Sequence, residues 1–379
     1  MVGRRFEVDI GPIAHGGHCV ARVSAGPTIE PEGSTTRPEV EPVEARVVFV
    51  RHALPGERVV LEITEGTEGD RFWRADAVEV ITPSADRVTP PCPYAGPGLC
   101  GGCDFQHVAL GAQRGLKSAV VAEQLRRLAG IDVPVDVEAV PNPLVEHGRD
   151  HGLGWRTRQR YVELPDGGRG MRKHRSHDVI PVETCLLEAP DGPTHEVNGR
   201  RFAVADGGFW QVHPGAPEAL VDAVLTALAP QPGERALDLY AGVGLFSRFL
   251  LDAVGPTGAV AAVEGDRTAS ELSARNCPGA TAHAGDVADV LVGGLPPAWD
   301  SADLVVLDPP RVGAKRTVVE QVAARAPRAI AYVACDPAAL ARDVAIFAEH
   351  GYQLAGLRAF DLFPMTHHVE CVALLRPNS

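Results

Sequence analysis

Short apolar runs alternate with helical runs from about residue 203 to residue 379, and this alternation constrains the fold more than any other feature. Strand–helix alternation is typical of a doubly wound, mostly parallel sheet with helices packed on its faces. We therefore predict an α/β domain for the C-terminal part of the chain. Its expected strands are 235–240, 259–264, 280–284, 304–307, 329–334, 353–360 and 369–375.

The expected strand ends carry a glycine turn and acidic side chains. Open sheets of this kind bind ligands outside the carboxyl ends of their strands. Gly242 lies in the turn after the first strand and lets the backbone approach a cofactor, and Glu264 ends the second strand, where an acid can bind ribose hydroxyls. Asp286 closes the third strand in the same way. One acid alone is a routine helix cap, but an acid in the first turn and at each of the next two strand ends is rarely accidental.

This pattern narrows the choice of cofactor. The NAD fingerprint has a third glycine that is absent here, and a P-loop needs Gly-Lys followed by Ser or Thr, also absent. The acids instead resemble those of the S-adenosylmethionine site of class I methyltransferases, which have a Rossmann-like sheet. The resemblance implies a methyltransferase domain that binds S-adenosylmethionine, and we place it at residues 206–379.

Cys335 follows the fifth expected strand directly, and Glu370 lies at the start of the last one. A thiol nucleophile and a carboxylate base on neighbouring strand ends suit attack on an electrophilic ring carbon, followed by removal of a proton. The thiol would have to be partly ionised, so we expect a depressed pKa. The alternative is a buried core cysteine, which Cys335 taken alone would favour, since free Cys is among the most buried residue types.

Length, composition and net charge indicate the general class of the protein. A length of 379 residues predicts two or three domains, and 45% hydrophobic with 22% charged residues is ordinary globular composition. No apolar run reaches membrane-spanning length, and the start of the chain lacks the apolar core of a signal peptide. We therefore expect a cytoplasmic monomer with no membrane contact. The net charge of −13 argues weakly against nucleic acid as a bulk partner, but it does not exclude a local basic surface.

The first 85 residues have an all-β pattern. Segment 24–42 is rich in Pro, Glu, Ser and Thr, and we interpret it as a flexible insertion between strands. Short strands with glycine turns predict a small barrel, and this one resembles a TRAM domain, an RNA-binding barrel. A β-barrel without a ligand is an equal alternative. The expected strands are 5–10, 20–23, 44–50, 57–64 and 72–81.

Residues 86–205 form the expected central, β-rich domain, which carries a cysteine cluster. Cys92, Cys100 and Cys103 lie in a loop rich in Gly and Pro, and Cys185 is the best candidate for a fourth ligand. Thiolate sets select zinc or an iron–sulfur cluster over hard cations, and the spacing does not decide between the two. Eight cysteines in a chain of this length and class indicate metal binding or catalysis rather than a disulfide framework.

The same domain concentrates basic side chains. We expect a strand that projects Arg156, Arg158 and Arg160 from one face, joined through a turn at 165–168 to a second basic segment. A cationic ribbon of this kind suits an RNA phosphate backbone, and a solvated charged face is the alternative. Helix 110–129 is expected to pack on the catalytic domain. The candidate RNA-binding residues are Arg156, Arg158, Arg160, Arg172, Lys173 and Arg175.

Five motifs carry a family resemblance over nearly the whole chain. They are Cys92 with Cys100-Gly-Gly-Cys103 and Gln106-His107, Phe209-Trp-Gln211-Val, Asp308-Pro-Pro-Arg311, Cys335-Asp-Pro-Ala and His368-Val-Glu370. With these motifs the chain resembles the RNA 5-methyluridine methyltransferases that act on transfer and ribosomal RNA.

The resemblance implies roles for particular residues. It implies a [4Fe–4S] cluster on Cys92, Cys100, Cys103 and Cys185, with zinc as the alternative metal. The implied contacts with S-adenosylmethionine are Gln211, Tyr240, Glu264, Asp286 and Asp308, beside Gly242. Three positions depart from the family pattern and weaken any transfer of substrate identity. They are His213 and Asp336, where Asn is usual, and Leu245, at a position that is often polar.

The implied chemistry explains why a thiol and a carboxylate occur together. Carbon-5 of uracil is a poor nucleophile, and attack of Cys335 at carbon-6 would make it nucleophilic enough to take a methyl group. Glu370 would then remove the carbon-5 proton. The alternatives are methylation of cytosine carbon-5 or another RNA position, and a non-catalytic RNA-binding iron–sulfur protein. The last would leave the pairing of Cys335 with Glu370 unexplained.

Overall fold

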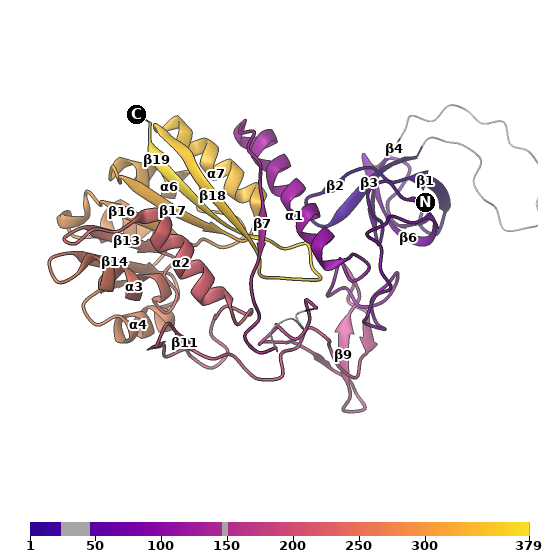
Figure 1. Cartoon of the computed structure of the whole chain (residues 1–379), viewed down its shortest axis with the longest axis horizontal. Coiled ribbons are helices and arrows are strands. Elements are labelled where there is room, and N and C mark those ends of the chain that lie inside the picture. Colours follow the sequence, from indigo (N-terminus) through magenta and orange to yellow (C-terminus); the bar gives the residue numbers. More distant parts are fainter. Residues whose placement is uncertain (24–45, 146–150, 379) are drawn as a thin grey trace, which may run out of the picture. The chain divides into compact units, whose positions relative to one another are not determined.

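The computed structural model describes residues 1–23, 46–145 and 151–378, so the predicted insertion 24–42 lies outside the described residues. The chain divides into two compact units, each of which combines segments distant in sequence (Figure 1). Unit 1 contains Met1–Leu116, Gln159–Leu186 and Phe363–His367. Unit 2 contains Lys117–Arg158, Leu187–Leu362 and His368–Ser379.

A curved, six-stranded sheet forms the N-terminal part of unit 1 and confirms the predicted all-β pattern. Its strand order is β1-β5-β6-β4-β3-β2, and only β4 and β6 pair in parallel. Alternate residues are buried, as Phe6 and Val8 are in β1, because successive side chains of a strand point to opposite faces. The strands are β1 (Arg5–Asp9), β2 (Ile13–Ala14), β3 (His18–Val23), β4 (Arg46–Arg51), β5 (Arg58–Glu65) and β6 (Phe72–Thr82).

The predicted basic hairpin is confirmed in part. β8 (Val162–Glu163) and β9 (Arg169–Arg172) pair antiparallel across the predicted turn, and β10 (Val179–Pro181) adds a third strand. The strand expected for Arg156, Arg158 and Arg160 is wrong. The backbone N–H of Arg156 donates to the carbonyl of Leu187 and that of Thr157 to the carbonyl of Val212, so two separate segments accept hydrogen bonds from this stretch in place of a neighbouring strand.

An eight-stranded sheet forms the centre of unit 2, in the order β15-β14-β13-β16-β17-β19-β18-β7. The seven predicted strands are confirmed with small shifts at their ends, and the first five pair in parallel. The last pair is antiparallel, and the edge strand β7, only three residues long, escaped prediction. The strands are β7 (Val137–Ala139), β13 (Arg235–Leu239), β14 (Ala259–Glu264), β15 (Thr281–Ala284), β16 (Leu304–Leu307), β17 (Ala329–Ala334), β18 (Tyr352–Asp361) and β19 (Glu370–Pro377).

Helices cover the sheet in two groups of neighbours (Figure 1). Contacts link α2, α3 and α4 in one group, and α5, α6 and α7 in the other. The predicted helix 110–129 is helical throughout, as α1 (Leu110–Gln124) followed by a π-helical turn at Leu125–Ala129. The other helices are α2 (Ala216–Leu228), α3 (Leu245–Val254), α4 (Arg267–Asn276), α5 (Val287–Asp289), α6 (Lys315–Ala324) and α7 (Pro337–Glu349).

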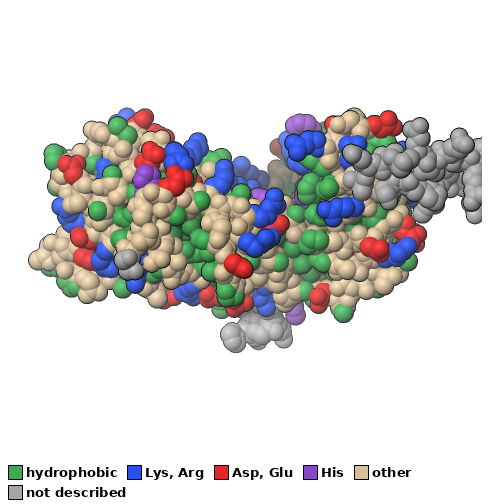
Figure 2. Space-filling view, turned by 90° about the horizontal axis from the view of Figure 1, so that it is seen from above, with side chains coloured by type: hydrophobic (Ala, Val, Ile, Leu, Met, Phe, Trp, Pro, Cys, Tyr) green, Lys and Arg blue, Asp and Glu red, His purple; other side chains and the backbone are tan. Residues whose placement is uncertain are grey.

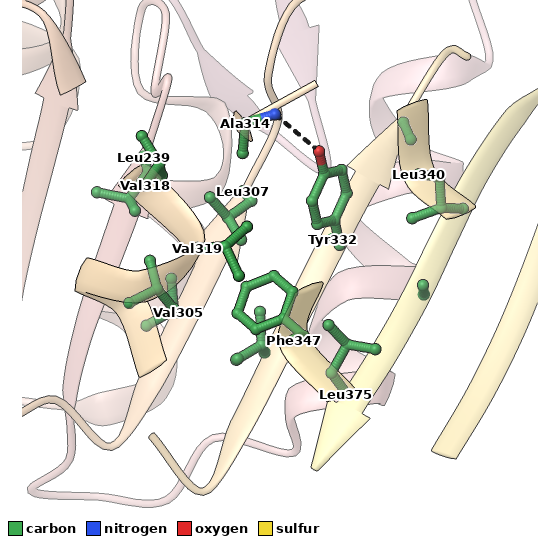
Figure 3. Packing of buried hydrophobic residues seen from close by; sticks show 14 of the residues in the cluster. Leu239, Val305, Leu307, Ala314, Val318, Val319, Tyr332, Leu340, Phe347 and Leu375 are labelled. Atoms are coloured by element: carbon green, nitrogen blue, oxygen red, sulfur yellow. Dashed lines mark hydrogen bonds between the residues drawn. The ribbon is translucent and has the colours of Figure 1, made fainter. Parts of the chain in front are cut away.

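The largest hydrophobic core lies between the sheet and the group that contains α6 and α7 (Figure 3). Phe347 of α7 and Val319 of α6 pack against Leu307 and Tyr332 of the central strands. Leu125, fully buried in the turn after α1, belongs to the same cluster. Burial of this apolar area fixes the central strands, and with them the positions of the residues at their ends. No helix within the described residues is long and apolar enough to cross a membrane.

Candidate active site

The turn after β13 is shaped by its glycines and by the acid at the end of β14. Tyr240 has a φ of +63°, an unusual value for a residue with a Cβ, and Gly242 and Gly244 also have positive φ. A Cβ at Gly244 would lie 2.6 Å from the sulfur of Cys277, so only glycine fits there. The N–H of Gly242 donates to Oε2 of Glu264 at 2.8 Å. Glu264 therefore fixes the glycine turn as well as ending its own strand.

Asp238, inside β13, is the acid that most constrains this edge of the sheet. It is fully buried, and its Oδ2 accepts hydrogen bonds from the N–H of Ser247 at 2.8 Å and from its hydroxyl at 2.6 Å. Oδ1 has no hydrogen-bond partner within the part of the chain that the structure describes. Burial raises the pKa of Asp238 to about 7, and the hydrogen bonds from Ser247 oppose that rise.

Asp308 and Asp286 complete the acidic group. Asp308 follows β16, and burial together with the charges of Asp238 and Glu264 raises its pKa to about 7. Asp286 caps α5, because its Oδ1 accepts from the N–H groups of Ala288 and Asp289. Burial, followed by the charge of Asp286, raises the pKa of Tyr240 to about 12, so Asp286 lies within electrostatic reach of that ring. The predicted cofactor residues Tyr240, Gly242, Glu264, Asp286 and Asp308 thus gather at one edge of the unit 2 sheet.

Gln211 lies in a segment without regular structure whose next two residues are fixed by contacts. The carbonyl of Val212 accepts hydrogen bonds from the backbone and the hydroxyl of Thr157, both at 3.0 Å. The ring of His213 is almost fully buried and stacks on Trp155. His213, one of the departures from the family pattern, therefore anchors the backbone next to Gln211.

The structure brings Cys335 and Glu370 together. Cys335 follows the last residue of β17, and Glu370 is the first residue of β19. The two strands pair antiparallel with Ala334 opposite Cys371, so the thiol and the carboxylate lie at one edge of the sheet. Glu370 is buried, with 4% of its surface exposed.

The expected depression of the thiol pKa is wrong for this state of the protein. Burial, followed by the charge of Glu370, raises the pKa of Cys335 to about 12, and Asp308 and Asp336 add to the rise. Arg311 acts in the opposite direction and lowers the pKa. Burial and then Asp308 also raise the pKa of Glu370 well above its usual range, again opposed by Arg311. The raised pKa values could not be predicted from the sequence, because they depend on burial and on how many acidic side chains the fold brings to one edge of the sheet.

Arg311 is a candidate functional residue to which the sequence analysis gave no role. Its Nη2 lies 3.2 Å from Nε2 of His368, two residues before Glu370. Its charge lowers the pKa of both Cys335 and Glu370, so it balances the acids around them. The motif Asp308-Pro-Pro-Arg311 could have indicated a role for Arg311, because it places a cation three residues after an acid at the end of a strand.

A buried network holds the loop that carries Arg311. Asp343 of α7 accepts from the hydroxyl of Tyr332 at 2.5 Å and from the N–H of Ala314 at 2.7 Å. The N–H of Ala314 also donates to the same hydroxyl at 3.0 Å (Figure 3). The loop is thereby tied to β17, the strand that ends at Cys335, and to the helix that follows it.

The four predicted metal ligands all lie in unit 1. Burial raises the pKa of Cys100 and that of Cys103, the latter to about 12, and the charge of Cys185 adds to both. Cys92 acts on Cys100 in the same way, so the four thiols lie within electrostatic reach of one another. Within residues 1–23, 46–145 and 151–378, however, no three Cys, His, Asp or Glu side chains are placed to hold a metal ion. The metal centre stays a prediction.

The predicted RNA-binding residues fall in different surroundings. Arg156 and Arg158 belong to unit 2, and Nη1 of Arg158 donates to the carbonyls of Gly207 and Gly208. Arg160 and the other three belong to unit 1. On the face shown in Figure 2, basic side chains lie among acidic ones rather than forming one continuous surface.

Two of these residues line a cavity of about 640 Å³ in unit 1. Lys173 and Arg175 lie along its wall together with Arg51 and Arg74 of the barrel. Glu65, also in the wall, pairs with Arg74 at 3.1 Å and with Arg175 at 3.3 Å. Carboxylates therefore hold several of the cations in place, and the cavity is large enough for a nucleotide.

The fold and the acid-lined strand ends define a class I methyltransferase domain, and comparison with known proteins specifies the family. The family model described as tRNA (Uracil-5-)-methyltransferase matches residues 299–378, and the TRAM domain model matches residues 1–78. The predicted TRAM-like barrel is thus confirmed.

Similar proteins include an uncharacterized RNA methyltransferase of Streptomyces avermitilis, 42% identical over 99% of each chain. The 23S rRNA (uracil(1939)-C(5))-methyltransferase RlmD of a Shewanella species is 30% identical over 87% of this chain and 91% of its own. The crystal structure of the tRNA (uracil-54, C5)-methyltransferase of Pyrococcus abyssi with S-adenosyl-L-homocysteine has a TM-score of 0.63 at 20% identity, over 86% of this chain and 95% of that one. The chain belongs to the family of S-adenosylmethionine-dependent RNA methyltransferases that contains the uracil-5 enzymes.

The raised pKa of Cys335 predicts how its thiol reacts with iodoacetamide. Below that pKa the thiolate fraction grows about tenfold for each pH unit, so alkylation should accelerate from pH 7 to pH 10 without a plateau. Arg311→Met removes the cation that lowers the pKa and should slow alkylation at pH 8, by about threefold or more. Glu370→Gln removes a charge that raises the pKa and should accelerate it. Mass spectrometry of the Cys335 peptide measures the rates, and a plateau near pH 8 would contradict the account.

Proposed function

We propose that this protein transfers a methyl group from S-adenosylmethionine to carbon-5 of a specific uridine in structured ribosomal or transfer RNA. The observation that carries the proposal is the meeting of Cys335 and Glu370 at the paired ends of β17 and β19, beside the acid-lined cofactor edge. The relative named for 23S rRNA, at 30% identity, makes ribosomal RNA the first substrate to test.

The cofactor edge supports binding of S-adenosylmethionine, which supplies an electrophilic methyl group. Glu264, which ends β14, is proposed to bind the ribose hydroxyls. Nothing would contact a Cβ added at Gly242, so a ligand can approach that backbone closely. Gln211, Tyr240, Asp286 and Asp308 are proposed as the further contacts.

In the proposed reaction Cys335 Sγ forms a bond to carbon-6 of the uracil ring, and the electron pair moves toward carbon-5 and the carbonyl oxygen at carbon-4. Carbon-5 would then take the methyl group, with S-adenosylhomocysteine as the leaving group. Glu370 accepts the carbon-5 proton, the bond from sulfur to carbon-6 breaks, and the double bond returns. The thiol proton is recovered by the sulfur or the solvent, so the net reaction exchanges one ring proton for one methyl group.

The raised pKa values of Cys335 and Glu370 have a consequence for this sequence of steps. The charge of Glu370 raises the pKa of Cys335, so a charged carboxylate disfavours the thiolate. Attack requires the charge on sulfur, and proton removal requires it on the carboxylate. Arg311, which favours the charged form of both, is therefore proposed to stabilise the site through the whole cycle.

Unit 1 is proposed to bind the RNA. The TRAM match and the cavity wall formed by Lys173 and Arg175 support this role. Arg160 and Arg172 of the same unit, and Arg156 of unit 2, are proposed as further phosphate contacts. Arg158 is proposed to act with them, although its guanidinium also fixes the 207–208 backbone. A target base buried in folded RNA must leave its stack to reach Cys335, and contacts with the RNA backbone offset that cost.

Cys92, Cys100, Cys103 and Cys185 are proposed to hold a [4Fe–4S] cluster, with zinc as the alternative. The donor set supports it, since four thiols in one unit match the usual ligation of such clusters. Hydrogen bonds to two of the sulfurs support it as well. The N–H of Gly102 donates to Cys100, and the amide of Gln106 donates to Cys103, both at 3.4 Å.

Metal analysis of anaerobically purified protein tests the cluster. We expect about four iron atoms and a matching amount of sulfide in each chain. Cys185→Ala should lower the iron content, whereas Cys277→Ala, at a buried cysteine outside the set, should not. One zinc atom in place of iron would establish the alternative metal.

Cys335→Ala should abolish methylation while binding of S-adenosylmethionine survives, because Cys335 is not among the proposed cofactor contacts. Nucleoside mass spectrometry of the treated RNA measures the product, and calorimetry measures binding. Retained 5-methyluridine formation in this variant would contradict the mechanism. Formation of 5-methylcytidine by the unaltered protein would favour the cytosine alternative.

Glu370→Gln should trap a covalent complex, since methyl transfer proceeds and the carbon-5 proton then has no acceptor. Turnover should fall by about 100-fold or more, the usual range for loss of a general base. A protein–RNA band that is stable on denaturing gels measures the complex. The absence of such a band, with RNA binding intact, would count against Glu370 as the base.

A further inference from the structure

The segment that leads into Glu370 is held in unit 1, although Glu370 itself belongs to unit 2. The chain leaves unit 2 after Leu362, belongs to unit 1 over Phe363–His367, and returns to unit 2 at His368. We call Phe363–His367 the strap. It joins β18 to β19, so it precedes by only a few residues the carboxylate proposed as the base.

Backbone hydrogen bonds fix the middle of the strap. The carbonyl of Met365 accepts from the N–H of Asp104 at 2.9 Å and from that of Phe105 at 3.0 Å. The N–H of Met365 donates to the side-chain oxygen of Gln113 at 2.8 Å. Met365 has a φ of +67°, an unfavourable value for a residue with a side chain, so these contacts hold it in that conformation.

His367, the last residue of the strap, is held by contacts with Asp104. Oδ2 of Asp104 accepts from the backbone N–H of His367 at 3.1 Å and lies 2.6 Å from Nδ1 of the same residue. The side chain of Asp104 is largely buried, with 11% of its surface exposed. Nη2 of Arg51 lies 3.8 Å from the other oxygen. A Cβ at Gly17 would lie 2.6 Å from Cβ of His367, so the barrel leaves the histidine no room to shift toward that turn.

Only a short stretch of chain separates His367 from the carboxylate of Glu370. His367 and Glu370 are three residues apart, which spans at most about 10 Å of extended chain. Between them, His368 contacts Arg311 at 3.2 Å and Val369 is buried. The backbone therefore has little slack with which to absorb a displacement of His367 before Glu370 moves.

We propose that the Asp104–His367 pair positions Glu370 for removal of the carbon-5 proton. The inference rests on the proposed function and adds a residue pair that lies outside the reacting groups. Asp104 follows Cys103 directly, so the pair also connects the cysteine segment to the base. A displacement of about 1 Å at a reacting group can cost about 100-fold in rate. Loss of the hydrogen bond between Asp104 and His367 should therefore slow removal of the carbon-5 proton by Glu370 more than the other steps.

Two variants of His367 test the proposal. His367→Ala loses the side-chain hydrogen bond to Asp104, whereas His367→Asn keeps a donor near the position of Nδ1. With His367→Ala we expect turnover to fall by about tenfold or more. The covalent protein–RNA complex should accumulate, as with Glu370→Gln. RNA deuterated at carbon-5 should show a larger isotope effect on turnover than with the unaltered protein. His367→Asn should restore most of the activity.

Asp104→Asn serves as a second variant and should reproduce the effects of His367→Ala. Asp70→Asn is the control, because this exposed aspartate of unit 1 caps a turn by accepting from Thr67. Binding of S-adenosylmethionine should be unchanged in all four. A loss of turnover in His367→Ala without accumulated complex and without an enlarged isotope effect would overturn the proposal, as would unchanged turnover. Failure of the unaltered protein to form 5-methyluridine would instead overturn the proposed function, so the two failures are distinguishable.

Discussion

The reversed direction of the last strand is the constraint on which the candidate site depends. Only eight residues separate Asp361, the end of β18, from Glu370, too few for the crossover that a parallel connection requires, so β19 runs antiparallel to β18. It lies between β18 and β17 in the sheet and is antiparallel to β17 as well. Reversal brings the start of β19, rather than its end, to the edge where the parallel strands end. Glu370 thereby meets Cys335, and the strap and Arg311 act on a pair that the strand pairing has already assembled.

The same convergence explains the electrostatics of the site. Parallel strands deliver Glu264 and Asp308 to one edge, and Asp238 is buried close behind them. Carboxylates packed away from water disfavour one another's ionisation and that of a nearby thiol, which is why the pKa values of Asp308 and Cys335 rise. One cation, Arg311, opposes this trend, and a separate buried network built on Asp343 and Tyr332 holds its loop. An acidic edge that suits a cationic cofactor thus also makes the nucleophile harder to ionise.

Much of unit 2 could be predicted from sequence, because apolar runs ending in Asp, Glu or Cys mark both the strands and their functional ends. Three features could not be predicted. The strand expected for Arg156 to Arg160 is replaced by hydrogen bonds to two remote segments, which local charge alternation does not reveal. The rise in the thiol pKa depends on the summed charges of residues far apart in the chain. The contact between Asp104 and His367 joins residues that are 263 positions apart, and no sequence motif links them.

The central claim is that Cys335 forms a bond to the uracil ring during methyl transfer, and RNA containing 5-fluorouridine tests it most directly. Fluorine at carbon-5 cannot leave as a proton, so the unaltered protein should stop at the methylated covalent complex. Nuclease and protease digestion followed by tandem mass spectrometry identifies the attached residue. We predict one methylated 5-fluorouracil nucleotide on the peptide that contains Cys335. Attachment to another residue, or product formation from ordinary RNA with no complex from the fluorinated RNA, would contradict the account.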